Sequence, residues 1–131
     1  MTLAFDTVEF DRLPPRRARW FVRSVLTRWG LPEVLDDAEL LVDELVCNAM
    51  RHARGTGVDV TVRSVDDVVR VEVSDRDPDF FIDFQRPPDA PPRFGLRIVD
   101  SIARRWGVDP GPYGKVVWFE LDARRAARSS A

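Results

Sequence analysis

Hydrophobic residues recur at every third or fourth position in two long segments of the chain, a spacing typical of amphipathic helices. The first segment begins after Pro15 and continues to about Trp29, where Gly30 ends it. The second begins after Pro32 and continues to about Ala53. The apolar stripes are Ala18, Phe21, Val22, Val25, Leu26 and Trp29 in the first, and Leu35, Ala38, Leu41, Val42, Leu45, Val46 and Ala49 in the second. Two helices that each bury one face are therefore predicted.

Other segments alternate between apolar and polar residues, which predicts strands. The clearest are 58–65 and 68–75, which a two-aspartate turn joins as an antiparallel hairpin. Residues 3–10 alternate more loosely, and 116–121 form a short run rich in valine and aromatic residues. We expect all four segments to belong to one sheet.

Neither period is present from about residue 76 to 93, where five of the ten prolines and several aspartates gather. A loop of this length is usually a lid or a mobile segment. Its run of aromatic residues at 80–84 either pins the loop to the core or forms a patch that faces a partner.

Helical spacing resumes from Gly95 to Trp106, and Gly107 closes this third predicted helix. A turn at 109–114 leads into the last strand, and the tail over 122–131 is expected to fray. The order of elements predicts an α+β fold, a two-layer α/β sandwich with helices on one face of a mixed, mostly antiparallel sheet.

Length and composition limit the class of protein. The 131 residues suit a single domain over 1–131, and a net charge of -2 argues against a protein that coats nucleic acid. Basic residues of the first helix and acidic residues of the second predict a solvated, mutually screened surface. The single cysteine, Cys47, excludes an intrachain disulfide and is expected to be a packed, inert thiol. The chain shows no signal peptide and no stretch of about 18 apolar residues, so a cytoplasmic location without membrane contact is expected.

Candidate chemistry begins on the second helix. Glu44, Asn48 and His52 are spaced four residues apart, so they lie along one stripe. Arg51 lies beside this stripe. An amide oxygen can complete the coordination of a Mg²⁺ ion held mostly by phosphates and waters, and a carboxylate one turn away can orient or deprotonate an attacking hydroxyl. Alternatively, these are polar residues at the edge of a buried helix.

Two further features lie beyond this helix. Asp75 ends a strand just before a proline-containing turn, where its carboxylate can accept a hydrogen bond from an adenine amino group. Gly95 begins a helix, where free backbone N–H groups attract phosphate. An ordinary turn-forming aspartate and an ordinary N-terminal glycine are the alternatives.

Taken together and in this order, these features resemble the histidine-kinase-like (GHKL) ATPase superfamily. The chain is most similar to the small bacterial anti-sigma-factor serine/threonine kinases and their regulatory relatives. The resemblance covers nearly the whole chain and is carried by WFVRSVLTRWGLPEVLDDAELLVDELVCNAMRHA, VEVSDRDP, GLRIVDSIARRWGV and GKVVWFEL.

This resemblance implies a Bergerat-type ATP-binding fold with ATP and Mg²⁺ as cofactors. It implies a kinase that holds a sigma factor inactive and phosphorylates a serine or threonine of an anti-anti-sigma antagonist. Kinases of the resembled family often form homodimers, although the sequence does not fix the oligomeric state, and the charge balance predicts no direct contact with nucleic acid.

The same resemblance assigns roles to individual residues. Glu44 takes the place of the catalytic base, Asn48 that of the Mg²⁺ ligand, and Asp75 that of the aspartate that reads adenine. The remaining residues assigned to the nucleotide site are Arg51, His52, Pro78, Gly95, Leu96 and Arg97.

The chain departs from the family pattern at three positions. Arg93 replaces one glycine of the phosphate-binding loop, Asp77 replaces a glycine after Asp75, and Val116 replaces a threonine whose hydroxyl would lie near adenine. A Cβ at position 93 disfavours a positive φ, although the guanidinium can itself reach phosphate. We therefore expect weaker ATP binding than in a full kinase. Two alternatives stay open, a non-catalytic module that sequesters its partner by surface contact and an ATPase without protein transfer.

Overall fold

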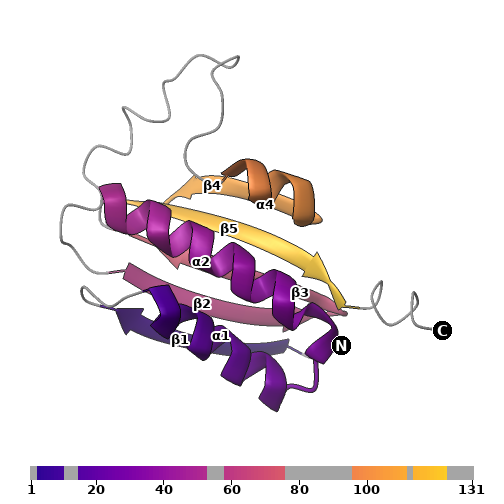
Figure 1. The fold of residues 1–131 in the computed structure, drawn as a ribbon. Helices are drawn as coiled ribbons and strands as arrows, with labels where there is room; N and C mark the ends of the chain where they lie inside the picture. Colours follow the sequence, from indigo (N-terminus) through magenta and orange to yellow (C-terminus); the bar gives the residue numbers. More distant parts are fainter. Residues whose placement is uncertain (1–2, 11–14, 53–57, 76–95, 112–113, 124–131) are drawn as a thin grey trace.

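The computed structural model describes residues 3–10, 15–52, 58–75, 96–111 and 114–123. Within them, five strands form one open sheet in the order β1-β2-β3-β5-β4 (Figure 1). The strands are β1 (Leu3–Phe10), β2 (Val58–Val65), β3 (Val68–Ser74), β4 (Arg105–Pro110) and β5 (Lys115–Asp122). The helices are α1 (Pro15–Arg28), the short 3-10 helix η1 (Pro32–Val34), α2 (Leu35–His52) and α4 (Leu96–Ile102).

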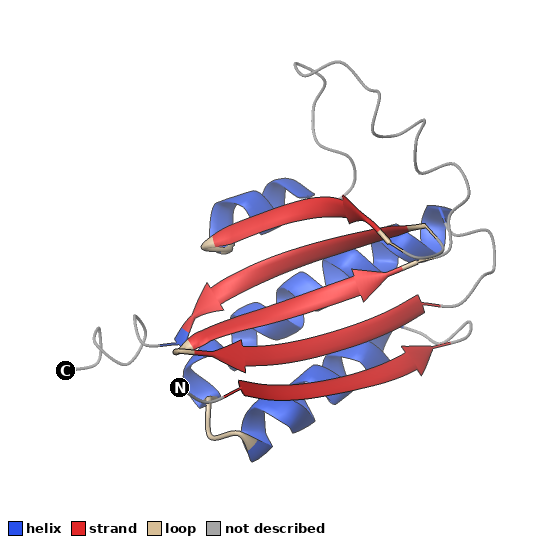
Figure 2. Cartoon of the chain, turned by 180° about the vertical axis from the view of Figure 1, so that it is seen from behind, coloured by secondary structure: helices blue, strands red, loops and turns tan. Residues whose placement is uncertain are grey.

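All of the helices lie on one face of the sheet, as the view from behind makes plain (Figure 2). This confirms the predicted α+β sandwich. The expected sheet was mixed and mostly antiparallel, whereas each strand pairing in the described part of the chain is antiparallel.

Turn chemistry explains where several elements end. Gly30 has a φ of 70°. Its N–H donates to the Thr27 carbonyl, and the Leu31 N–H donates to the Leu26 carbonyl, which is the Schellman pattern that ends α1. Asp66 and Asp67 have φ values of 51° and 67°. Paired left-handed residues of this kind form the type I′ turn that suits a two-residue hairpin, so β2 and β3 pair as predicted.

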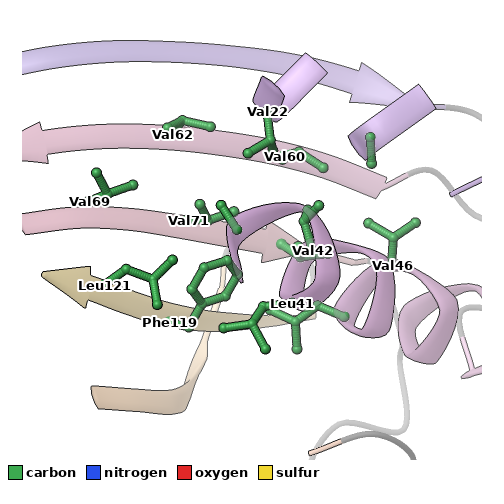
Figure 3. Packing of buried hydrophobic residues seen from close by; sticks show 14 of the residues in the cluster. Val22, Leu41, Val42, Val46, Val60, Val62, Val69, Val71, Phe119 and Leu121 are labelled. Atoms are coloured by element: carbon green, nitrogen blue, oxygen red, sulfur yellow. The ribbon is translucent and has the colours of Figure 1, made fainter. Parts of the chain in front are cut away.

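The core lies between the helices and the inner face of the sheet (Figure 3). Val60, Val71 and Phe119 from the sheet are fully buried, as are Leu41 and Val42 from α2. The predicted stripes are confirmed, although Phe21, Trp29 and Leu35 are only partly buried. Cys47 is half-buried, so the thiol is less completely packed than predicted.

The third helix is shorter than the sequence pattern predicted. The α4 helix ends at Ile102, and Trp106 and Gly107 belong to the strand β4. The Arg104 N–H donates to the Glu120 carbonyl at 2.8 Å, so the backbone leaves the helix to pair with the open edge of β5. Trp106 and Val108 are then the inward positions of a short edge strand. The spacing of Trp106 and Val108 does not conflict with the helical spacing of the residues before them, so the sequence pattern did not mark the change from helix to strand.

The end of the chain is ordered further than expected. Asp122 closes β5, and Ala123 is buried and donates its backbone N–H to the Asp67 carbonyl at 2.8 Å. The expectation of a frayed tail was therefore wrong at 122–123, and 124–131 lie outside the described residues. The predicted lid over 76–93, with its aromatic run at 80–84, also lies outside them.

Charged side chains cover the outer surfaces. Between α1 and α2, Arg23 pairs with Glu39 at 2.8 Å and Arg19 with Asp43 at 3.5 Å, so the predicted mutual screening is confirmed. Such exposed pairs contribute about 0–1 kcal/mol each to stability. No described helix is both long and apolar enough to cross a bilayer.

The sheet face that carries no helix has its own packing. The indole of Trp118 lies across Gly107, and a Cβ at position 107 would come within 2.7 Å of the ring. The guanidinium of Arg70 stacks on the same ring at 3.9 Å and pairs with Glu120 at 3.1 Å. The glycine thus admits a large aromatic side chain between β4 and β5.

We predict that Gly107→Ala lowers the free energy of unfolding by about 1–3 kcal/mol, because the methyl group forces the indole out of its place. Urea unfolding provides the measurement. In a Trp118→Leu background the same substitution should cost clearly less, since the obstructing ring is gone. An equal cost in both backgrounds would show that the ring does not cause the effect.

Candidate functional site

Three elements of the fold converge at one end of the sheet, on its helix-covered face. The last turns of α2, the end of β3 and the beginning of β5 lie together there (left in Figure 1), because β3 and β5 are antiparallel and α2 packs on both. The α4 helix packs against α2 beside them. This end of the sheet contains most of the described residues that the sequence assigned to nucleotide binding.

On α2, Glu44 is half-buried and Asn48 lies one turn further along the same side of the helix. Asn48 is only 6% exposed, since it lies between the core residues Leu45 and Ala49. Its carbonyl oxygen Oδ1 is buried and has no hydrogen-bond partner within the described part of the chain. A buried polar atom of this kind lowers stability, so it is typical of a site that a ligand completes.

Asp75 owes its position to the alternation of β3. Val69, Val71 and Val73 point into the core, so the next inward position is Asp75, which is 1% exposed. Its backbone N–H donates to the Lys115 carbonyl at 3.0 Å, which continues the pairing of β3 with β5 by one step. A carboxylate therefore lies at the inner edge of the core.

Lys115 is a site residue that the sequence reasoning missed. It is 6% exposed, and its Nζ lies 3.0 Å from Oδ2 of Asp75. The contact is a close ion pair between two buried side chains. The sequence did contain a signal for this position. Val117, Phe119 and Leu121 are the inward residues of β5. Extending this alternation by two residues toward the start of the strand places Lys115 on the inward face as well.

The same alternation changes the interpretation of Val116. Val116 pairs with Ser74. Successive side chains of a strand point to opposite faces of the sheet, so these two residues face the opposite way from their neighbours Asp75 and Lys115. The side chain at position 116 is therefore on the far face of the sheet from Asp75. Replacing a threonine by Val116 does not remove a hydroxyl from the side where Asp75 lies.

The other predicted site residues are less fully described. Arg51 and His52 lie in the last turn of α2, as predicted. Leu96 is the first residue of α4 and Arg97, the next, is exposed. The predicted roles of Pro78 and Gly95, and the departures at Asp77 and Arg93, lie outside the described residues.

The donor set bears on which metal could bind. Among the described residues, no three histidine, cysteine or acidic side chains gather into a cluster. The buried Oδ1 of Asn48 is a hard, neutral oxygen, which suits a Mg²⁺ ion whose other ligands are phosphate and water oxygens. The described residues fit that group and would not form a protein-only metal cage.

Comparison with protein-family models gives one match over most of the chain. A model described as a histidine kinase-like ATPase domain matches residues 11–121. That span includes Glu44, Asn48, Asp75 and Lys115. A search of curated proteins found no match.

We predict that Asn48→Leu raises the free energy of unfolding of the ligand-free protein by about 0.5–2 kcal/mol, because it replaces an unsatisfied buried amide by an apolar side chain of similar size. Chemical denaturation without nucleotide or metal provides the measurement. Leu45→Ala, one turn away in the core, is the control and should destabilise by about 2–5 kcal/mol. A clear loss of stability in the Asn48 variant would mean that the amide has a structural role.

Proposed function

The chain belongs to the histidine kinase-like ATPase domain family, and on that premise we propose that it is a bacterial regulatory protein of the anti-sigma-factor type. In this proposal it binds ATP with Mg²⁺ and phosphorylates a serine or threonine of an anti-anti-sigma antagonist. The observation that carries the proposal is the buried Asn48 oxygen, one helical turn from Glu44 and at the same end of the sheet as Asp75.

Each residue has a role that its chemistry supports. Asn48 would hold Mg²⁺ through Oδ1, and the ion, when bound, supplies positive charge that neutralises the phosphates. Asp75 would accept a hydrogen bond from the amino group of adenine, since an ionised carboxylate is only an acceptor. Ligand binding at this end of the sheet would give the buried Asn48 oxygen a partner.

Glu44 would act on the substrate hydroxyl. Its half-buried carboxylate would orient the hydroxyl and take up its proton as the oxygen attacks the terminal phosphorus of ATP. The bond from that phosphorus to the bridging oxygen breaks, and ADP leaves. Most of the rate in such a reaction comes from positioning, which the rigid packing of α2 on the sheet supports.

The outer surface supports contact with protein partners. Trp20 is 68% exposed on α1, and Leu40 is exposed on α2. Large apolar side chains exposed in this way are common at protein interfaces. The sequence similarity to the anti-sigma-factor kinases favours a sigma factor and its antagonist as those partners. A cytoplasmic location follows from the same proposal.

A second candidate function is a non-catalytic module that sequesters a partner by surface contact. The ion pair between Asp75 and Lys115 favours it, because the carboxylate that would read adenine already has a cation beside it. Transfer of labelled phosphate from ATP to a cognate antagonist distinguishes the kinase from the non-catalytic module. A labelled antagonist would exclude the non-catalytic module.

We predict that the native chain binds ATP in the presence of Mg²⁺, and that Asn48→Ala weakens this binding by roughly 10-fold or more, because a ligand oxygen is lost. Isothermal titration calorimetry measures both. Glu39→Gln, on the same helix but paired with Arg23 at the surface, is the control and should bind like the native chain. If the native chain does not bind at millimolar ATP, the kinase proposal fails.

We further predict that Glu44→Gln retains ATP binding within a few-fold but lowers the rate of phosphate transfer by about 10²–10⁴, the usual contribution of a general base. Transfer to the antagonist is measured in single turnover. Asp43→Asn removes the neighbouring carboxylate, which contacts Arg19, and should leave the rate unchanged. Equal rates in the native and Glu44 variant proteins would remove Glu44 from the mechanism.

A further inference from the structure

We propose that the solvent-facing side of α1 around Trp20 is the docking surface for an acidic segment of the protein substrate. The residues concerned are Arg16, Arg17 and Trp20, which we call the α1 patch. This inference rests on the proposed kinase function, and it adds the surface by which the kinase would recognise its protein substrate.

The three side chains of the α1 patch share one face of the helix. Trp20 follows Arg16 by four residues and Arg17 by three, so the three positions are neighbours on the helix surface. Ala18 and Val22 take the opposite side of the helix and are buried in the core. The same three residues line a shallow hollow on the described surface. Two guanidinium groups and an indole therefore meet at one open site.

The charge of α1 is of one sign. The helix contains arginines and no acidic residue. Arg19 and Arg23 each pair with an acidic residue of α2. Arg16 and Arg17 are exposed and have no ion pair within the described part of the chain. Positive charge that the fold does not neutralise is therefore available at the α1 patch.

Trp20 gives the α1 patch an apolar centre. It is 68% exposed, more than Leu40 or Ile98, which are the other large apolar residues exposed on the described surface. Tryptophan and arginine are enriched among the residues that dominate the binding energy of protein interfaces. Guanidinium groups bind carboxylates through paired hydrogen bonds. A segment with acidic residues beside an apolar one is therefore the partner that fits.

The position of the α1 patch connects it with the candidate catalytic base. Arg23 pairs with Glu39, and Arg19, one turn earlier on α1, pairs with Asp43, one turn later on α2. The two helices are therefore antiparallel, and the first turn of α1 lies at the same end of the sheet as the last turns of α2 (Figure 1). A protein that binds the α1 patch can reach Glu44, the residue after Asp43, across the outer surface of α2.

A nucleic acid also combines negative charge with flat aromatic groups, but the chain favours a protein partner. Proteins that bind nucleic acid strands have a positively charged groove along the backbone. This chain has a net charge of -2, and the α1 patch contains two arginines. An acidic protein segment is therefore the occupant that we assign to the patch.

The probe is a dye-labelled helical peptide with glutamates and leucines on one face. Fluorescence anisotropy measures its binding to the full chain, next to a matched peptide in which lysine replaces each glutamate. We expect the native chain to bind the acidic peptide about 10-fold or more tightly than the basic one, because the charges are complementary. Added salt should weaken this binding, since the arginines are exposed.

Variants of the α1 patch test each residue. Arg16→Glu and Arg17→Glu should each weaken binding of the acidic peptide by about 10-fold, and the double variant should prefer the basic peptide. Trp20→Ala should weaken it by about 10-fold or more, whereas Trp20→Phe should retain most of the affinity. Because all three positions are exposed, urea unfolding should give a free energy close to that of the native chain.

Arg104→Glu is the matched control. It makes the same change in charge at an exposed position just before β4, where Arg104 lies 3.7 Å from Asp122. Peptide binding should be unchanged in this variant. An effect as large as that of Arg17→Glu would show that the overall charge, and not the α1 patch, determines binding.

The phosphate-transfer assay then tests whether the docked protein is the substrate. Arg17→Glu should raise the KM for the antagonist by about 10-fold and leave kcat and the affinity for ATP unchanged, because the patch holds the substrate away from the reacting atoms. An unchanged KM in this variant would overturn the assignment of the patch to the substrate.

The other outcomes separate the docking surface from the proposed function. A native chain that binds ATP but binds both peptides equally, or neither, overturns the docking surface and leaves the proposed function intact. Tighter binding of a single-stranded oligonucleotide than of the acidic peptide also overturns the docking surface. Failure to bind ATP, with the peptide preference present, overturns the proposed function instead.

Discussion

The antiparallel pairing of β3 with β5 is the constraint on which the rest of this molecule depends. It brings Val71 opposite Phe119 in the centre of the core, and one step beyond the last strand pair it brings Asp75 opposite Lys115. Core and candidate site are therefore successive positions along the same pair of strands. A slip of β3 by one residue against β5 would expose the valines of β3 and turn Asp75 to the face of the sheet opposite Lys115.

The α2 helix likewise contributes both to the core and to the candidate site. Its apolar stripe packs on the sheet and makes Leu41, Val42, Leu45 and Val46 fully buried or nearly so. The same packing buries Asn48, whose oxygen lacks a partner within the described residues. Strong packing elsewhere on the helix maintains a local arrangement that is unfavourable by itself, which is a common property of ligand sites.

Sequence patterns predicted most of the fold because its long elements have strong periods. The helices α1 and α2 and the hairpin of β2 and β3 have bounds within a few residues of the prediction. The β4 strand was missed because its identity depends on the open edge of β5, a partner that local spacing cannot reveal. Position 123 was misjudged for a similar reason, since its hydrogen-bond partner is Asp67.

For the candidate site, the spacing of Glu44 and Asn48 and the strand-end position of Asp75 placed these residues on the right elements. Lys115 was missed because it lies between the predicted turn at 109–114 and the predicted strand at 116–121. Only the inward alternation of β5 identifies it as buried. The roles assigned to these side chains remain predictions for the experiments on nucleotide binding and transfer.

The place of the last strand in the sheet also bears on how the chain folds during synthesis. Although β5 is the last of the described strands along the chain, it lies between β3 and β4 and contributes Phe119 to the centre of the core. A nascent chain that lacks these residues would hold β4 without a partner and leave one edge of β3 open. The described sheet can therefore close only after β5 has left the ribosome, and a fragment that stops before β5 would be prone to edge-to-edge association.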